Sequence, residues 1–297
     1  MTATTQPDYV RTSTGDAWSD QAAEYSSMML TGPMLLLIHV MYKHMQSYRL
    51  FSSATTMLDI GSGPGSATYT LLNDHANDIA PDVKIVATDF SEGMVEQVKQ
   101  LKAKQIAGLD DGPAKRLWKR VEAEVTDAQD LSAVSDNSIS HATASLVLFM
   151  VPDSGKALSE IHRVLESGGV MSCSSWKKAT WMNIAMEAAG KDGDSFKLPA
   201  RWDDVDGTRK MLEDAGFVDV KVEEVETCLK YEDAGRLAEW FFGSKNPPLL
   251  ALLRDLSEEQ RIQARATLAK LFEERKDKRL GGVAGIGIVA SGRKAIK

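Results

Sequence analysis

A glycine-rich turn at residues 61–65 is the feature of the sequence that points most directly to ligand chemistry. The run LDIGSGPG (58–65) leads from apolar residues into a segment with helical spacing. Glycines at such a turn allow a tight bend and let a ligand lie against bare backbone. The dinucleotide pattern G-x-G-x-x-G would need glycine at position 66, where this chain has Ser66. The turn therefore favours a ligand without a pyrophosphate, with a plain strand-to-helix turn as the alternative.

Acidic residues stand at the ends of successive predicted strands. Asp59 lies just before the glycine turn, where dinucleotide-binding folds usually keep an apolar residue, and its carboxylate suits a ligand's ammonium group. Asp89 follows the run 83–88 and can accept hydrogen bonds from both hydroxyls of a ribose, although Ser91, a predicted helix N-cap, also allows a simple turn. Asp127 follows the run 120–125, where a carboxylate beside a backbone N–H can bind the amino edge of adenine. Ligands of open α/β sheets bind at the shared carboxyl edge, so the three predict one site.

The elements that must position these residues alternate between β-rich runs and helical segments. We expect strands at 57–60, 83–88, 120–125, 142–149, 170–174, 218–222 and 285–291. Helical spacing follows the glycine turn at 67–73, recurs at 209–215, and extends from an N-cap at Asp153 to a stop at Gly168. This alternation predicts an α/β fold with a parallel sheet covered on both faces.

Helical segments at both ends of the alternating region predict a cap over the sheet. The first 15 or so residues are Thr-rich and are expected to be disordered. A helical pattern then runs from Ser19 to Ser47 with a break at Gly32-Pro33, and another covers 232–276. Within the second, Ser257 and Gln260 match a capping box.

Composition favours a small-molecule enzyme of the cytoplasm. The net charge is -7, and no basic run interleaves with aromatic residues, which argues against nucleic acid as a partner. Two cysteines, Cys173 and Cys228, give no disulfide framework and fit a reducing compartment. The N-terminus has no signal-peptide core, and the apolar stretch Met28–Tyr42 is too short to span a bilayer. We therefore expect no membrane association.

Taken together, these features resemble the class I S-adenosylmethionine-dependent methyltransferase family over about residues 20–292. The resemblance rests on LDIGSGPG (58–65), ATDFSEGM (87–94), TDAQDL (126–131), LVLFMVPD (146–153) and EIHRVLESGG (160–169). It implies a Rossmann-like sheet, mostly parallel with an antiparallel last strand, and a helical cap. Residues 1–50 would form the N-terminal tail and cap helices, and residues 51–292 the methyltransferase domain with a helical cap insertion at about 230–280.

The resemblance also implies S-adenosylmethionine as the cofactor. The residues that it assigns to cofactor binding are Tyr25, Asp59, Gly61, Ser62, Gly63, Asp89, Phe90, Met94, Asp127, Ala128 and Ser145. More narrowly, DFSEGM (89–94), SGGVMSCSSW (167–176), LEDAGFVDVKV (212–222) and MLTG (29–32) resemble the fungal gliotoxin thiol methyltransferase type. That likeness implies a small specialised metabolite as acceptor, methylated on a thiol or a hydroxyl.

The sequence offers no definite catalytic base. Many relatives place a histidine after the fourth strand, where this chain has Phe149 and Met150, which we interpret as an apolar pocket wall. The candidates for contact with the acceptor are His39, Phe149, Trp176 and Trp240, although each residue of this type is more often part of a core. No His/Cys cluster has metal-ligand spacing, so no metal is expected.

Two other classes of function stay open at this stage. A protein of the same fold could bind S-adenosylmethionine without transferring its methyl group, as a rearrangement catalyst or a regulator. A nicotinamide-dependent dehydrogenase would instead bind NAD through the glycine turn. The segment SLVL (145–148) lacks the proline-proline-aromatic motif of enzymes that methylate base amines, which disfavours nucleic-acid methylation.

Overall fold

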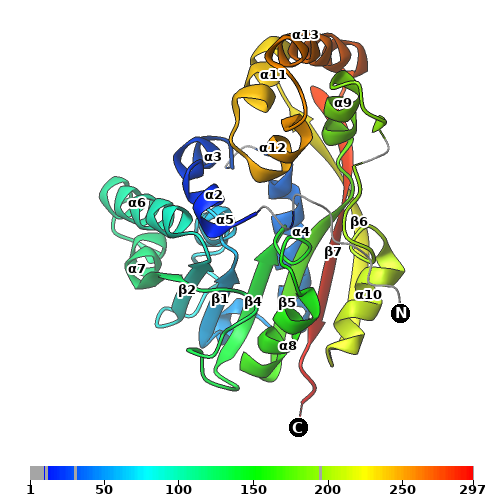
Figure 1. Ribbon diagram of the computed structural model, residues 1–297. Coiled ribbons are helices and arrows are strands. Elements are labelled where there is room, and N and C mark those ends of the chain that lie inside the picture. The colour runs from blue at the N-terminus through cyan, green and yellow to red at the C-terminus, as the bar shows by residue number, and fades with distance from the viewer. Residues whose placement is uncertain (1–9, 11–12, 30–31, 194–195, 297) are drawn as a thin grey trace.

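A computed structural model describes residues 10, 13–29, 32–193 and 196–296 of the chain. Its strands are β1 Thr56–Ile60, β2 Lys84–Asp89, β3 Val121–Val125, β4 Ile139–Ser145, β5 Leu165–Lys178, β6 Val218–Lys230 and β7 Gly282–Arg293. They form one seven-stranded sheet in the order β3-β2-β1-β4-β5-β7-β6 (Figure 1). Strands β1 to β5 pair in parallel, and β7 runs antiparallel to both β5 and β6. The expected mostly parallel, Rossmann-like sheet with an antiparallel last strand is confirmed.

Helices cover both faces of the sheet, as the alternating pattern predicts. Their bounds are α4 Met34–Tyr48, α5 Ser66–Asp74, α6 Glu92–Gly108, α7 Pro113–Arg120, α8 Ser154–Val164 and α10 Val205–Asp214, with a 3-10 turn η1 at Phe51–Ser53. Met57 of β1 packs with residues of α4 to α7, whereas its neighbour Leu58 packs with residues of α8 and α10. Successive strand residues point to opposite faces, so one strand contributes to two apolar layers.

The helical cap is larger than the insertion expected at about 230–280. Between β6 and β7 lie α11 Ala234–Gly243, α12 Pro247–Leu253 and α13 Glu258–Arg275. A further helix, α9 Thr180–Ala188, packs with them: Trp181 and Ile184 share an apolar cluster with Phe241 and Phe272. These helices gather around one end of β6 and β7, whose Leu229 and Val283 belong to the same apolar cluster (Figure 1). The predicted capping box at Ser257 is confirmed.

Two short helices in the N-terminal segment lie against α6. They are α2 Gly15–Ser19 and α3 Ala22–Met29. The Ser19 hydroxyl lies 2.8 Å from that of Ser91 and accepts a hydrogen bond of 3.0 Å from the Gly93 amide. Of the 15 residues expected to be disordered, residues 1–9, 11 and 12 lie outside the described residues, and a helix already begins at Gly15.

Several predicted boundaries are wrong. The strands expected at 170–174 and 218–222 are longer, at Leu165–Lys178 and Val218–Lys230, and their pairing with β7 continues to Lys178 and Lys230. The fourth strand ends at Ser145 and does not continue to residue 149, because Leu146 adopts a left-handed backbone with φ 57° and turns the chain. The helix capped by Asp153 ends at Val164, not at Gly168, because Leu165 already pairs with β4 as the first residue of β5. The Asp153 cap itself is confirmed by a hydrogen bond from the Lys156 amide to its side chain.

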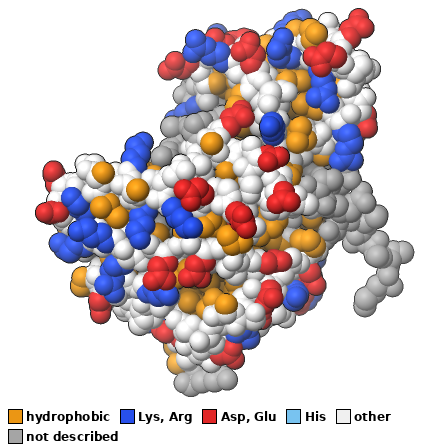
Figure 2. Space-filling model, turned by 60° about the vertical axis from the view of Figure 1, so that its left-hand side comes forward, with side chains coloured by type: hydrophobic (Ala, Val, Ile, Leu, Met, Phe, Trp, Pro, Cys, Tyr) orange, Lys and Arg blue, Asp and Glu red, His pale blue; other side chains and the backbone are white. Residues whose placement is uncertain are grey.

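The surface mixes charges of both signs. On the face in Figure 2, Lys and Arg side chains are interspersed with Asp and Glu, and hydrophobic side chains lie between them. Within the described part of the chain, no helix is both long and apolar enough to cross a membrane.

Candidate functional site

The glycine turn is shaped by backbone conformations and contacts that favour glycine. Gly61 and Gly63 have φ of 59° and 54°, a region that other residues rarely adopt. A Cβ atom on Gly61 would lie 2.3 Å from Cγ2 of Val147, so a side chain does not fit there. The Ser62 amide donates a hydrogen bond of 2.8 Å to the carbonyl of Thr88 on β2. These contacts fix the turn between β1 and α5 against two neighbouring strand ends.

Asp59 is a buried carboxylate held by hydroxyl and amide donors. Its Oδ2 accepts hydrogen bonds of 2.7 Å from the Thr68 hydroxyl and 3.2 Å from the Thr68 amide, and its Oδ1 accepts one of 3.0 Å from the Thr143 hydroxyl. Only 5% of the residue is exposed. Burial raises the pKa of Asp59 to about 6, and the nearby charge of Asp89 adds to the rise, while the three hydrogen bonds oppose it.

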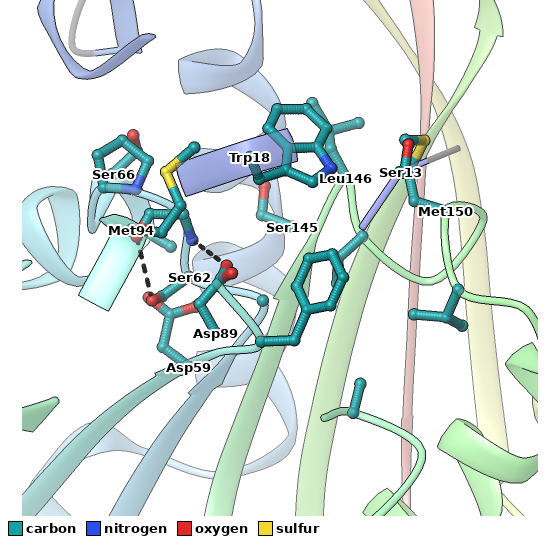
Figure 3. A pocket seen from close by; sticks show the side chains of 18 of the residues that line it. Ser13, Trp18, Asp59, Ser62, Ser66, Asp89, Met94, Ser145, Leu146 and Met150 are labelled. Carbon is teal, nitrogen blue, oxygen red and sulfur yellow. Dashed lines mark hydrogen bonds between the residues drawn. The ribbon is translucent and has the colours of Figure 1, made fainter. Parts of the chain in front are cut away.

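Asp89 ends β2 and is tied to the glycine turn. Its Oδ2 accepts a hydrogen bond of 2.9 Å from the Gly63 amide, and its Oδ1 accepts one of 2.9 Å from the Ser91 amide. Burial raises the pKa of this carboxyl above its ordinary value, against the opposing effect of these backbone donors. Asp59 and Asp89 therefore lie together at the carboxyl edge of the sheet (Figure 3).

A cavity of about 250 Å³ opens over this edge, and we call it the first cavity. Every residue that the sequence assigns to cofactor binding lines it: Tyr25, Asp59, Gly61, Ser62, Gly63, Asp89, Phe90, Met94, Asp127, Ala128 and Ser145. Its other described lining residues include no Lys, Arg or His. The charged groups on its wall are thus all carboxyl groups, which suits a ligand with positive charge.

Four of the predicted cofactor-binding residues line the part of the first cavity beside β3: Phe90, Met94, Asp127 and Ala128. Asp127 is exposed, and its Oδ1 accepts a hydrogen bond of 2.8 Å from the Gln129 amide. Ala128 is buried next to it, and Met94 is buried in the wall. Phe90 keeps 42% of its surface exposed at the cavity, an unusual position for a phenylalanine.

The N-terminal helices close the first cavity from above. Tyr25 of α3 meets Trp18 of α2 edge-on, with ring centroids 5.5 Å apart. Burial, and secondarily the charge of Asp89, raises the pKa of Tyr25 to about 12. Sequence reasoning missed Trp18, because only the packing of α2 on α6 brings it to the site (Figure 3). An aromatic residue in an otherwise polar terminal segment was the available signal.

A second cavity of about 200 Å³ adjoins the first. Three of the predicted acceptor contacts, Phe149, Trp176 and Trp240, line it. The residues that line both cavities are Trp18, Tyr25, Met34, Leu146 and Met150. The expectation that Phe149 and Met150 form an apolar wall is confirmed.

The wall of the second cavity is almost free of ionisable groups. Among its described residues there is no Asp, Glu, His, Lys, Arg or Cys, and Tyr25, with its raised pKa, is the one titratable side chain. Aromatic rings dominate the wall, and Trp176 and Trp181 pack edge-on with centroids 5.0 Å apart. The second cavity suits a flat apolar molecule.

His39, the fourth predicted acceptor contact, is not brought to the site. It lies exposed on α4, where its Nδ1 is 3.4 Å from Oδ2 of Asp74. The apolar side of α4 faces the sheet, and His39 comes directly after the buried Leu37 and Ile38. Each residue of an α-helix is turned by about 100° from the one before it, so His39 lies on the exposed side. His44, on the same helix, is buried and lies 3.2 Å from the Ser291 hydroxyl, outside the lining of both cavities.

The described part of the chain contains no cluster of side chains that could bind a metal ion. No group of three or more His, Cys, Asp and Glu side chains there is arranged to hold an ion.

Comparison with known proteins agrees with this geometry. A family model described as "Methyltransferase domain" matches residues 58–173. Methyltransferase tpcH of Aspergillus fumigatus is 30% identical over 256 residues, covering 80% of this chain and 84% of that protein. Methyltransferase ucsB of Acremonium sp is 28% identical over 242 residues, covering 81% and 82%. The YcgJ protein of Bacillus subtilis shares the fold, with a TM-score of 0.53 and 14% identity over 87% of this chain and 99% of that one. The chain therefore belongs to the class I S-adenosylmethionine-dependent methyltransferases.

Proposed function

We propose that this enzyme transfers the methyl group of S-adenosylmethionine to a thiol or an acidic hydroxyl of a small, largely apolar specialised metabolite. The observation that carries the proposal is the pair of adjoining cavities: the described wall of the first has three aspartates and no basic residue, and that of the second is rich in aromatic rings. The first fits a charged cofactor and the second an apolar acceptor. Residues common to both walls would bring the two ligands together.

The residues of the first cavity fit S-adenosylmethionine. Asp59 and Asp89 are buried carboxyls with raised pKa values, and no basic side chain of the described wall compensates them. A ligand that carries an ammonium and a sulfonium would supply the missing positive charge. Asp89 would hold the ribose, and the open glycine backbone at Gly61 and Gly63 would accommodate the methionine part.

The second cavity determines which acceptors can react. When bound, S-adenosylmethionine supplies a methyl group on a positively charged sulfur, and the acceptor atom bonds to this carbon as the carbon–sulfur bond breaks and S-adenosylhomocysteine is released. The described wall offers no general base at neutral pH, because Tyr25 is its one titratable group and has a pKa of about 12. The acceptor must therefore lose its proton to solvent, which a thiol with a pKa near ~8.5 does readily and an aliphatic alcohol does not.

The chain's own part in the reaction is positioning and exclusion of water. Trp18 and Tyr25 close over the first cavity, and Leu146 and Met150 form the wall between the two cavities. Leu146 holds a left-handed backbone, and its amide donates a hydrogen bond of 3.1 Å to the Ser174 hydroxyl, which fixes the turn after β4. Strained backbone of this kind is found where a fixed geometry serves a site.

The test is methyl transfer from radiolabelled S-adenosylmethionine to a panel of aromatic thiols, phenols, aliphatic alcohols and amines. We expect labelled product from thiols and acidic phenols and none from aliphatic alcohols. Binding of S-adenosylhomocysteine without transfer to any member of the panel would contradict the proposal and favour a non-transferring role.

A pH series distinguishes an acceptor that ionises by itself from one that needs a base. With benzenethiol and phenylmethanethiol as acceptors, kcat/KM should rise with pH around a midpoint that moves with the pKa of the thiol. The same midpoint for both thiols would mean that a group of the protein removes the proton.

A further inference from the structure

Ser174 is a buried residue of β5 whose hydroxyl contacts the turn after β4. Only 1% of the residue is exposed, and it lies outside the linings of both cavities. Its Oγ accepts a hydrogen bond of 3.1 Å from the Leu146 amide and lies 3.3 Å from the Ser145 hydroxyl. Ser145 and Leu146 follow one another at the wall of the first cavity (Figure 3). The Ser174 side chain therefore holds two consecutive residues of that wall from behind.

The Leu146 amide depends on this hydroxyl because the pairing of the two strands ends there. Ser145 and Ser174 are the last residues that pair in the register of β4 with β5. Leu146 then turns the chain out of the strand with φ of 57°, and in the described part of the chain its amide has no acceptor besides the Ser174 hydroxyl. A leucine rarely adopts such a φ, and a conformation of this kind persists only where surrounding contacts hold it.

The turn that Ser174 holds lies between the two cavities. Leu146 and Met150 of this turn line both of them. Val147 packs against the bare backbone of Gly61, where a Cβ atom would lie 2.3 Å from the Val147 Cγ2. The turn therefore contacts the glycine turn on one side and the second cavity on the other. A shift of the Leu146 backbone would move the walls of both cavities together.

We propose that Ser174 is a positioning residue for methyl transfer, whose hydroxyl holds Leu146 in the conformation that sets the boundary between the methyl donor and the acceptor. This inference rests on the proposed function, since it takes the first cavity as the cofactor site and the second as the acceptor site. An in-line displacement needs the acceptor atom at a fixed distance and angle from the methyl carbon, and a misplacement of about 1 Å lowers the rate about 100-fold. Ser174 lines neither cavity, so it acts on the rate through the Leu146 backbone.

The test compares Ser174→Ala with Ser172→Ala, a matched control on the same strand. Ser172 lies two residues earlier, so its side chain points to the same face of the sheet, and it is also buried. Its hydroxyl lies 2.7 Å from that of Ser291, and both residues lie outside the linings of the two cavities. Each variant thus loses one buried hydroxyl from β5, but only Ser174→Ala removes the acceptor of the Leu146 amide.

Two quantities are measured on the full chain: kcat for methyl transfer to naphthalene-2-thiol, and the dissociation constant of S-adenosylhomocysteine by calorimetry. In Ser174→Ala, kcat should fall about 10–100-fold, because the reacting atoms are no longer held in line. The dissociation constant should stay close to the wild-type value, because Ser174 lines neither cavity. Ser172→Ala should leave both quantities close to those of the wild-type protein.

A second comparison tests whether the effect passes through the Leu146 backbone. Glycine adopts a positive φ without strain, so in Leu146→Gly the turn keeps its shape without the bond to Ser174. Adding Ser174→Ala to Leu146→Gly should therefore lower kcat far less than Ser174→Ala does alone. An equal factor in both backgrounds would mean that Ser174 acts by another route, and it would overturn the inference.

Three further outcomes would overturn the inference: an unchanged kcat in Ser174→Ala, an equal loss of kcat in Ser172→Ala, or a loss of kcat matched by an equal loss of affinity for S-adenosylhomocysteine. If Ser174→Ala does not fold, as its melting temperature would reveal, Ser174→Cys takes its place, because sulfur nearly keeps the size of the side chain and is a weaker acceptor. Its kcat should fall as well, and an unchanged value would refute the role. Absence of transfer by the wild-type protein to every thiol would contradict the proposed function, whereas an active wild-type protein with an unchanged Ser174→Ala contradicts this inference alone.

Discussion

The Gly63 amide donates a hydrogen bond of 2.9 Å to Oδ2 of Asp89, and this bond joins the glycine turn after β1 to the end of β2. The two segments are 26 residues apart in the chain. The Asp89 carboxylate both orders the turn and lines the first cavity, so it contributes to the shape of the site and to its negative charge. Loss of the Asp89 side chain would therefore affect both.

Asp89→Ala should weaken the binding of S-adenosylhomocysteine by about 1.5–3 kcal/mol, because charged hydrogen bonds are lost and the Gly63 amide is left without its partner. Isothermal titration calorimetry measures the change. Asp111→Ala is the control, since the Asp111 side chain is 94% exposed and lies outside both cavities. Equal affinity in Asp89→Ala and the wild-type protein would remove Asp89 from the binding site.

The raised pKa of Asp59 predicts a pH-dependent effect on stability. The pKa rises from 3.8 to about 6 in the folded protein, so the stability that this group contributes is present below pH 3.8 and is lost as the pH rises through about 6. The loss is on the order of 3 kcal/mol. Asp59→Asn, which cannot ionise, should gain melting temperature relative to the wild-type protein as the pH rises from about 4 to about 6, which is the interval between the two pKa values. Thermal melts of the ligand-free proteins measure this, and a difference that is constant over that range would contradict the assigned pKa.

Alanine substitutions at Gly61 and Gly63 form a matched pair that tests why the turn requires glycine. Alanine at either position must adopt a positive φ, at a cost of about 1–2 kcal/mol. Alanine at Gly61 would in addition overlap Val147, whereas a Cβ on Gly63 meets no atom within 4 Å. Gly61→Ala should therefore lose about 1–3 kcal/mol more free energy of unfolding than Gly63→Ala. Urea denaturation without cofactor compares the two, and equal losses would show that Val147 moves aside freely.

Substitutions at Trp18 and Trp181 distinguish the wall that the two cavities share from the wall of the second cavity alone. Trp18 lines both cavities, and Trp181 lines only the second. Trp18→Phe should raise KM for both S-adenosylmethionine and an aromatic thiol by about 2–10-fold, through lost aromatic contact. Trp181→Phe should raise KM for the thiol alone. If Trp18→Phe changes only one of the two KM values, the wall is not shared in solution.

Much of the fold could be predicted from local patterns, and the errors are informative. The predicted ends of the first two strands, residues 60 and 88, lie within one residue of the observed ends at Ile60 and Asp89, because glycine follows the first run and an acidic residue the second. The run after Ser145 continues apolar, so its composition does not reveal that the strand stops there. The left-handed turn at Leu146 is set by contacts with β5 through Ser174, which lies 28 residues away.

The sequence by itself determined the proposed cofactor site of this protein. The glycine turn, Asp59, Asp89 and Asp127 lie at ends of consecutive strands, and a parallel sheet places such ends on one edge whatever the details of packing. Short-range patterns of this kind depend only on the local backbone and the order of the strands.

The tertiary structure alone decided the proposed acceptor site. Trp18, Leu146 and Trp240 come from the N-terminal segment, the turn after β4 and the cap, and their joint position depends on how these parts pack. The same packing turned His39 outward to Asp74 and brought Trp18 inward. A side chain's place in such a wall is set by contacts between segments far apart in the chain, which no local pattern records.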